Sequence, residues 1–74
     1  MSTLERKELN YIVACVNVFA QEKQMTAKDA FFYLDRYRGL AYLQEFYEVE
    51  HTLSWADTME ALTTVCGRNG GLVQ

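Results

Sequence analysis

Hydrophobic residues recur every three or four positions along most of this 74-residue chain, which is the spacing of one face of an α-helix. Polar breaks divide the pattern into segments. Before the last of them, "EVEHTL" alternates polar and apolar residues, which favours an extended connection. We therefore predict an all-α fold, a compact bundle of about four short helices in a single domain, residues 1–74. The predicted helices span about 3–22, 27–38, 40–47 and 55–68, with the extended connection at 48–53.

Residues typical of helix ends stand at the boundaries of these segments. Ser2 and Glu5 have the spacing of a capping box at the start of the first helix. Thr26 and Ser54 are N-cap residues for the second and fourth helices, because their hydroxyl oxygens accept hydrogen bonds from orphan backbone N–H groups. Gly39 is expected to end the second helix, since glycine readily adopts the left-handed conformation past a helix end.

The first helix is apolar over more than half of its circumference. One face is formed at helical spacing by Leu9, Ile12, Val13, Val16 and Ala20. The apolar arc is extended by Tyr11, Cys15, Val18 and Phe19. A helix this apolar is either the centre of the domain or also in contact with another chain, and the sequence leaves both possibilities open.

The other helices each have one apolar face that we expect to point inward. On the second helix this face holds Ala27, Ala30, Phe31, Leu34 and Tyr37. On the third helix it holds Leu40, Leu43, Phe46 and Tyr47, and on the fourth it holds Trp55, Thr58, Met59, Leu62, Val65 and Cys66. Phe32 points away from the inner face, where it is either a tolerated single exposure or part of a contact surface.

The composition fits a folded domain that does not bind nucleic acid. Hydrophobic residues make up 50% of the chain and the net charge is −3 at pH 7, whereas disorder requires low hydrophobicity and high net charge. Nucleic-acid binding requires clustered Lys and Arg, but the 7 basic residues are scattered and the 10 acids outnumber them. The segment "LAYLQEFYEVE" contains no Lys or Arg, so a helix-turn-helix is also disfavoured.

No segment has the features of a membrane span or an export signal. The longest apolar run, Tyr11 to Val16, is far shorter than the ~20 residues that cross a bilayer. The N-terminal stretch lacks the apolar core of a signal peptide. We therefore expect a cytoplasmic protein that does not bind membranes. In that compartment Cys15 and Cys66 are expected to be buried thiols rather than a disulfide.

The single histidine, His51, lies in the acidic segment "YEVEHTLSWAD". A metal site requires at least three converging ligands, and the Glu48–His51 pair lacks the second pair and the further glutamates of di-iron bundles. We therefore predict no metal and no cofactor. His51 and Thr52 are expected to hydrogen-bond the connecting backbone before Ser54. The alternative is a small-ligand or metal site centred on the segment from Tyr47 to His51.

The protein is expected to bind another protein rather than to catalyse a reaction. No combination of nucleophile, base and pocket residues is recognisable in the sequence. An acidic surface would complement a basic partner and accelerate their encounter. Contacts with a partner, or with a second copy in a homodimer, are predicted at Tyr11, Val18, Phe32 and Tyr42.

Three stretches, "ELNYIVACVNVFA", "AFFYLDRYRGLAYLQEFYEVEHTLSWADTMEALT" and "CGRNGG", together resemble a small bacterial family, the domain of unknown function 3791. Tyr47, His51 and Thr52 before a capped helix are the most specific part of this resemblance, which covers about Glu8 to Gly71. The resemblance implies a short stand-alone bacterial protein whose gene often lies beside a gene for a protein similar to ADP-ribosyltransferases. It therefore implies an antitoxin-like or effector-partner role, and it transfers no catalytic residue.

Overall fold

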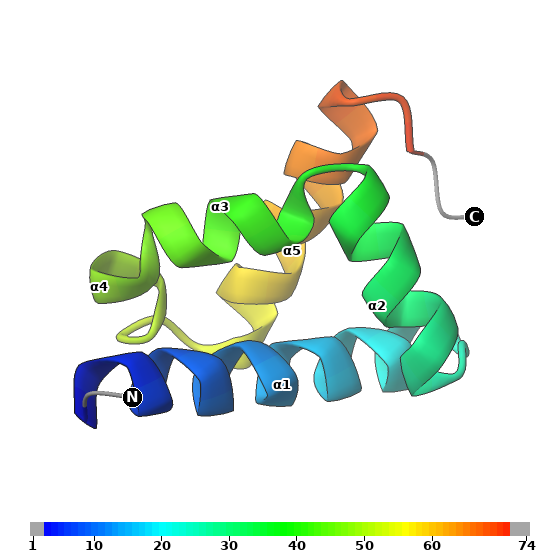
Figure 1. The fold of residues 1–74 in the computed structure, drawn as a ribbon. Coiled ribbons are helices and arrows are strands. Elements are labelled where there is room, and N and C mark those ends of the chain that lie inside the picture. Colours follow the sequence, from blue (N-terminus) through cyan, green and yellow to red (C-terminus); the bar gives the residue numbers. More distant parts are fainter. Residues whose placement is uncertain (1–2, 72–74) are drawn as a thin grey trace.

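A computed structural model describes residues 3–71 and confirms the all-α fold (Figure 1). Within this range there are five helices and no strand. Their bounds are α1 (Thr3–Lys23), α2 (Ala27–Arg36), α3 (Gly39–Glu45), α4 (Tyr47–Glu50) and α5 (Trp55–Arg68). None of the described helices combines the length and the hydrophobicity needed to cross a membrane. The cap predicted at Ser2 lies outside the described residues.

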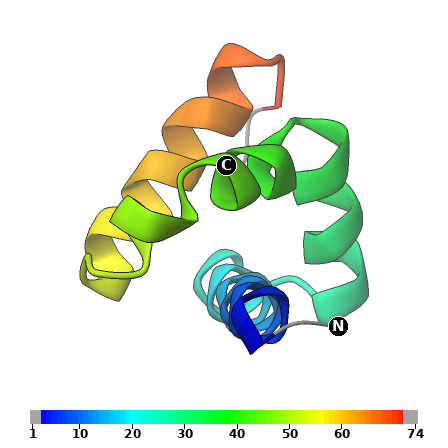
Figure 2. The same cartoon turned by 60° about the vertical axis from the view of Figure 1, so that its left-hand side comes forward.

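The helices are arranged around α1, which is the longest of them at 21 residues. In Figure 1, α2 turns away from the C-terminal end of α1, and α3 runs back above α1. α5 crosses behind α3 and packs against both α1 and α3. Figure 2 shows α1 nearly end-on, flanked by α2 and α5. Because α1 contacts α2, α3 and α5, it is the central helix that its wide apolar arc suggested.

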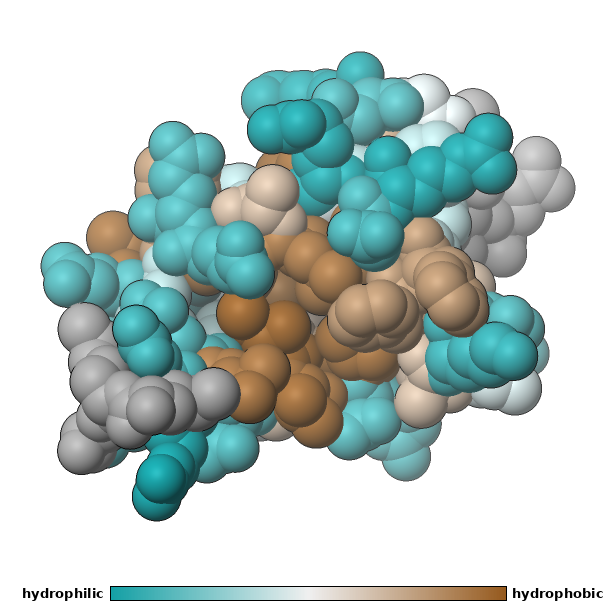
Figure 3. Space-filling model, in the orientation of Figure 1, coloured by the Kyte–Doolittle hydropathy of each residue, from teal (hydrophilic) through white to brown (hydrophobic). Residues whose placement is uncertain are grey.

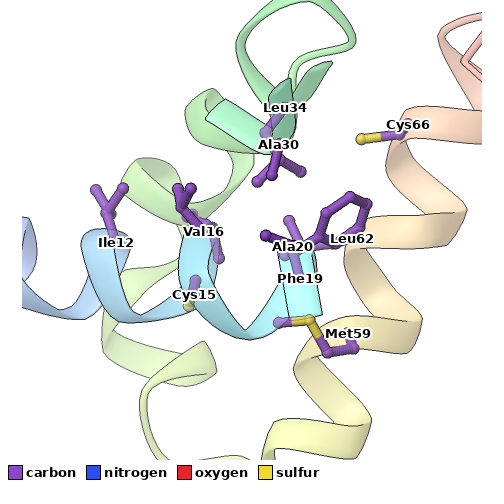
Figure 4. Close-up of a cluster of buried hydrophobic side chains, with 11 residues drawn as sticks. Ile12, Cys15, Val16, Phe19, Ala20, Ala30, Leu34, Met59, Leu62 and Cys66 are labelled. Atoms are coloured by element: carbon purple, nitrogen blue, oxygen red, sulfur yellow. The ribbon is translucent and has the colours of Figure 1, made fainter. Parts of the chain in front are cut away.

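The hydrophobic core lies between α1 and the helices that cover it (Figure 4). Each of four helices contributes one fully buried large side chain, namely Phe19, Leu34, Leu43 and Leu62. The complete cluster consists of Ile12, Cys15, Val16, Phe19, Ala20, Ala30, Leu34, Leu43, Met59, Leu62 and Cys66. The centre of each predicted apolar face is therefore correct.

The predicted inner faces are too wide at their edges. Residues that the helical pattern placed inside but that are exposed are Leu9, Val13, Ala27, Phe31, Phe46 and Trp55. A helix turns by about 100° per residue, so a neighbouring helix covers only the middle of a wide apolar arc. On α2, for example, Ala30 and Leu34 are fully buried whereas Phe31 is 46% exposed. The excess apolar surface is thus on the outside of the bundle.

The corner between α2 and α3 differs from the prediction. The left-handed residue is Arg38, with φ of 69°, and not Gly39; α2 already ends at Arg36. Gly39 is the first residue of α3 and is buried. A Cβ atom on Gly39 would lie 2.7 Å from Cδ2 of Leu34 and 3.2 Å from Sγ of Cys66. Close packing, rather than freedom of φ, is therefore what requires glycine at this position.

Replacing Gly39 with alanine is expected to lower the free energy of unfolding by about 1–3 kcal/mol, the usual effect of overpacking a filled core. The matched control is Gly67→Ala in α5, because a Cβ atom there meets nothing within 4 Å. That change should instead stabilise the protein by about 0.5–1 kcal/mol, since alanine favours the helix. Urea denaturation followed by circular dichroism measures both effects. Equal effects of the two substitutions would contradict this account of the corner.

The connection predicted to be extended contains the short helix α4 at Tyr47–Glu50. The backbone N–H of Glu50 donates to the carbonyl oxygen of Phe46 at 2.8 Å, and that of His51 donates to Tyr47 at 3.0 Å. The prediction of an extended segment at 48–53 is therefore wrong. A single helical turn is too short to establish a 3.6-residue period, so the local alternation of polar and apolar residues was misleading.

The predicted caps of α2 and α5 are confirmed. Oγ1 of Thr26 accepts a hydrogen bond from the backbone N–H of Asp29 at 3.1 Å. Oγ of Ser54 accepts one from the backbone N–H of Asp57 at 3.2 Å. In each helix the cap also places a carboxylate in the first turn, where it interacts favourably with the helix dipole.

Candidate functional site

The side chains of His51 and Thr52 form hydrogen bonds to backbone carbonyl oxygens of their own segment. Nδ1 of His51 lies 2.7 Å from the carbonyl oxygen of Tyr47, and because a carbonyl oxygen only accepts, Nδ1 carries the hydrogen. The Thr52 hydroxyl donates to the carbonyl oxygen of Val49 at 2.7 Å. Ser54 then caps α5. These side chains shape the turn between α4 and α5, which is a common use of polar side chains in turns.

Tyr11 is the centre of an aromatic cluster that joins α1 to this turn. Its ring is edge-on to Tyr47, with centroids 5.5 Å apart, and is stacked with Trp55 at 6.0 Å. His51 is stacked on Tyr47 at 4.6 Å. The structure thus brings together residues that sequence reasoning had assigned to separate roles, Tyr11 as a partner contact and Tyr47 and His51 as a ligand segment. Such ring pairs contribute about 0.5–1.5 kcal/mol each beyond their buried area.

Glu50 is a buried acid next to this cluster. Its side chain is only 3% exposed, and Oε1 has no hydrogen-bond partner among the described residues. The Thr58 hydroxyl donates to the carbonyl oxygen of Glu50 at 3.5 Å and lies 3.4 Å from the hydroxyl of Tyr11. Burial raises the pKa of Tyr42, and the neighbouring Glu50 raises it further. A buried polar atom without a partner costs about 1–3 kcal/mol, so stability alone does not explain this acid.

The two cysteines are buried and are not joined in a disulfide, as predicted. Burial raises the pKa of the Cys15 thiol to about 11, and burial also raises the pKa of Cys66. Both groups are therefore neutral thiols at neutral pH, whereas nucleophilic cysteines are thiolates. Across residues 3–71, no group of three or more His, Cys, Asp or Glu side chains is placed to hold a metal ion.

The residues predicted to contact a partner lie on several elements. Val18 is half-buried and lines a surface cavity of about 370 Å³ between α1 and α5, with Trp55 among its neighbours. Tyr42 is half-buried on α3, with its ring 5.0 Å from that of Phe46. Phe32 is 57% exposed on α2, where its ring contacts that of Phe31. Tyr11 and Val18 both adjoin Trp55, whereas Phe32 belongs to a different part of the surface.

Two adjoining cavities with apolar and acidic residues lie between α1 and α4. On α1, Leu9 and Val13 are 48% and 51% exposed and lie one helical turn apart; we call these two residues the α1 edge. Figure 3 shows a hydrophobic patch over the middle of α1, with hydrophilic residues around it. One cavity beside the edge, of about 330 Å³, is lined by Glu5, Glu8, Leu9, Ile12 and Gln44. A second, of about 260 Å³, is lined by Glu8, Gln44, Glu45, Phe46, Tyr47, Glu48 and Val49.

A family model described as a protein of unknown function (DUF3791) matches residues 10–69. The chain belongs to the DUF3791 family. This confirms the resemblance inferred from the sequence, and the match extends from the first half of α1 to the residue after α5. No curated protein and no solved structure matches this DUF3791 chain.

Sequence reasoning missed several residues of the candidate site in this DUF3791 domain. Trp55 was expected in the core but is 45% exposed, and Phe46 and Val49 are 44% and 60% exposed. Glu50 was treated only as part of an acidic segment. If a helix had been predicted over 47–50, the burial of Glu50 would have followed, because Tyr47 and Glu50 are three residues apart and share the buried face of that helix.

Proposed function

We propose that this DUF3791 domain is a protein-interaction module without catalytic activity, and that it binds another protein chain through the α1 edge. The observation that carries the proposal is the half-exposure of Leu9 and Val13 on a helix whose inner face is already filled by the core. Single exposed hydrophobic residues are normal, but contiguous apolar patches rimmed by polar residues typically mark interaction sites.

The surroundings of the α1 edge support the same conclusion. The cavity beside Leu9 shares Glu8 and Gln44 with the cavity at α4, so the two cavities adjoin and Phe46 and Val49 lie close to the α1 edge. Both described thiols have raised pKa values, which disfavours nucleophilic chemistry by either cysteine. A concave surface with apolar residues and no activated nucleophile suits binding better than catalysis.

We take the partner to be the product of a neighbouring bacterial gene, in an antitoxin-like arrangement. The family resemblance implies such a neighbour, similar to ADP-ribosyltransferases. The domain would neutralise or stabilise that protein by covering part of its surface. A second copy of the chain is the other candidate partner, because a small domain gains stability by burying additional apolar surface.

The alternative function, a small-ligand or metal site centred on Tyr47 and His51, has less support. The ring of His51 is stacked on Tyr47, and its Nδ1 is occupied by a backbone carbonyl. The hydroxyl of Thr52 is likewise bonded to a carbonyl of its own segment. These groups act within the turn rather than converging on a common point.

The double substitution Leu9→Gln/Val13→Gln is expected to weaken partner binding by about tenfold to a hundredfold. Covering the exposed half of each side chain is worth about half of the 1.5–3 kcal/mol for full burial, and about 1.4 kcal/mol corresponds to tenfold. The measurement is capture of the native partner from cell lysate, together with sedimentation of the purified protein to detect self-association. Helical circular dichroism should stay unchanged, because both side chains lie outside the core.

Asn10→Gln/Asn17→Gln is the matched control, since both residues are exposed on α1 and the replacing residue is the same. This variant should bind as the wild type does. Phe32→Asp is a second comparison, on α2. Loss of binding with Phe32→Asp but not with the α1 variant would move the interface to α2 and contradict the proposal.

A further inference from the structure

We infer that the surface from the α1 edge to α4 receives a basic amphipathic helix of the partner protein, with an apolar stripe flanked by Lys or Arg. The inference rests on the proposed function, because it assumes that the domain binds another protein. It goes further by naming the residues of the binding surface and the chemistry of the segment that fits it. We call this surface the acidic groove; its residues line the two cavities that share Glu8 and Gln44.

The apolar part of the acidic groove comes from both of its ends. Leu9 and Ile12 of α1 line one cavity, and Phe46 and Val49 line the other. Phe46 and Val49 are 44% and 60% exposed. Helix-in-groove recognition uses apolar anchors at helical spacing that enter such a surface. The two adjoining cavities provide places for successive anchors along one helix.

The charged residues of the acidic groove are all acids. Glu8, Glu45 and Glu48 line it, together with Glu5, and neither of its two cavities is lined by a Lys or Arg. Of the cavities on other faces, one between α1 and α5 includes Lys23 and one beside α3 includes Arg68, whereas the cavity at Val18 and Trp55 has a single charged residue, Glu22. Charge complementarity therefore selects a basic partner at the acidic groove in particular.

The charge distribution along the sequence strengthens this assignment. Between Arg38 and Arg68 the chain contains five acids and no Lys or Arg. That stretch includes α3 and α4 and carries four exposed large hydrophobic residues: Phe46, Val49, Leu53 and Trp55. Of these residues, the exposed Phe46 and Val49 line the same cavity as Glu45 and Glu48. Apolar exposure and negative charge therefore coincide at α4, which is the pattern that a basic amphipathic helix complements.

Two other occupants fit less well. A symmetric contact between two copies would bring the acidic groove of one chain against that of the other, and juxtaposed like charges oppose binding. The two cavities of the groove, of about 260 and 330 Å³, lie at the lower end of the roughly 300–1,000 Å³ of sites for small molecules. Their sizes are better suited to single side chains of a docked helix.

The test is a titration of the domain with a synthetic amphipathic peptide of about 14 residues, or about four helical turns. The peptide is built of Leu, Ala and Lys, with lysines on both sides of a leucine stripe, and a second peptide carries Glu in place of every Lys. The variant Glu45→Lys/Glu48→Lys reverses charge within the acidic groove. The matched control, Glu22→Lys/Glu60→Lys, reverses two exposed acids beside the cavities between α1 and α5.

Each double variant changes the net charge from −3 to +1, because two Glu→Lys changes add 2 units each. Non-specific attraction to total charge is therefore equal in the two variants. The wild type should bind the Lys peptide about tenfold or more tightly than the Glu peptide, and less tightly as salt is added. Glu45→Lys/Glu48→Lys should lose about tenfold for the Lys peptide and gain binding to the Glu peptide, whereas the control should change by about threefold or less.

The inference is overturned if the wild type does not prefer the Lys peptide, or if Glu45→Lys/Glu48→Lys does not gain binding to the Glu peptide. Equal effects of the two double variants would also overturn it. The gained binding to the Glu peptide also shows that the charge-reversed variant is folded. A wild-type dimer that Leu9→Gln/Val13→Gln dissociates would assign the groove to a second copy and overturn the basic helix. If the native partner is lost with Leu9→Gln/Val13→Gln but is insensitive to Glu45→Lys/Glu48→Lys, only this inference fails. If neither variant affects the native partner, the proposed function fails as well.

Discussion

Replacing Phe19 with alanine is expected to lower the free energy of unfolding by about 3–5 kcal/mol, the usual effect of removing a buried phenylalanine. The net stability expected of so small a domain is also about 3–5 kcal/mol. The free energy of unfolding of the Phe19→Ala variant should therefore be near zero, so that about half of its molecules are unfolded at 25 °C. Circular dichroism at 222 nm should show a large loss of helical signal relative to the wild type.

The size of this effect follows from the position of Phe19 in the core. Its side chain is fully buried on the central helix. The ring is stacked with that of Tyr33 at 5.7 Å, and the ammonium group of Lys23 lies 5.8 Å from the ring centroid. Alanine would leave a cavity where α1 meets α2, and it would remove both ring contacts.

Phe32→Ala is the matched control because it makes the same chemical change on the surface. Phe32 is 57% exposed, and surface substitutions usually change stability by less than about 0.5 kcal/mol. The Phe32→Ala variant should therefore unfold at nearly the wild-type urea midpoint. Comparable losses for Phe19→Ala and Phe32→Ala would mean that the core does not have the composition described above.

The elements that could be predicted from the sequence are those determined by local interactions. The caps at Thr26 and Ser54 depend on residues three positions away, so the pattern of hydroxyl and acid identifies them. The centre of each apolar face was also correct, since residues such as Leu34 and Leu62 lie in the middle of an arc that any neighbouring helix must cover. The corner at Gly39 could not be explained in advance, because its cause is contact with Leu34 and Cys66 in the packed state.

The candidate site shows the same division between local and tertiary information. The turn hydrogen bonds of His51 and Thr52 involve carbonyls three and four residues away, and the sequence suggested them. The stacking of Tyr11 on Trp55 joins residues far apart in the chain, and it depends on how α1 meets α5. Exposure of Leu9 and burial of Glu50 likewise depend on the placement of neighbouring helices. The helical period alone contains no information about that placement.

Alkaline pH is expected to destabilise the protein strongly, beginning near pH 9. Burial raises the pKa of Cys15 from its ordinary value of 9.0 to about 11, and that of Tyr11 from 10.0 to about 12. Burial also raises the pKa values of Tyr33, Tyr42 and Cys66. All of these groups favour the neutral form in the folded protein, so their effects on stability have the same sign.

The sign follows from proton binding in the two states. Below pH 9 the folded and unfolded chains both keep these protons, so the full stability is present. As pH rises, the unfolded chain releases them first, and stability is lost until the folded-state pKa values of about 11 and 12 are passed. One pKa unit corresponds to about 1.4 kcal/mol, so the shift of the fully buried Cys15 corresponds to about 3 kcal/mol in full, most of which is lost between pH 9 and 11.

Urea midpoints measured from pH 7 to pH 11, under reducing conditions, test this expectation. The Cys15→Ala variant should be less stable at neutral pH, but its stability should fall less steeply between pH 9 and 11. Adding an exposed thiol, in Cys15→Ala/Asn17→Cys, should not restore the steep fall, because Asn17 is exposed on the same helix and a thiol there titrates alike in both states. A wild-type midpoint that is constant across this range would show that Cys15 is not held as a buried neutral thiol. A fall of unchanged steepness in Cys15→Ala would instead attribute it to the other groups with raised pKa values, namely Tyr11, Tyr33, Tyr42 and Cys66.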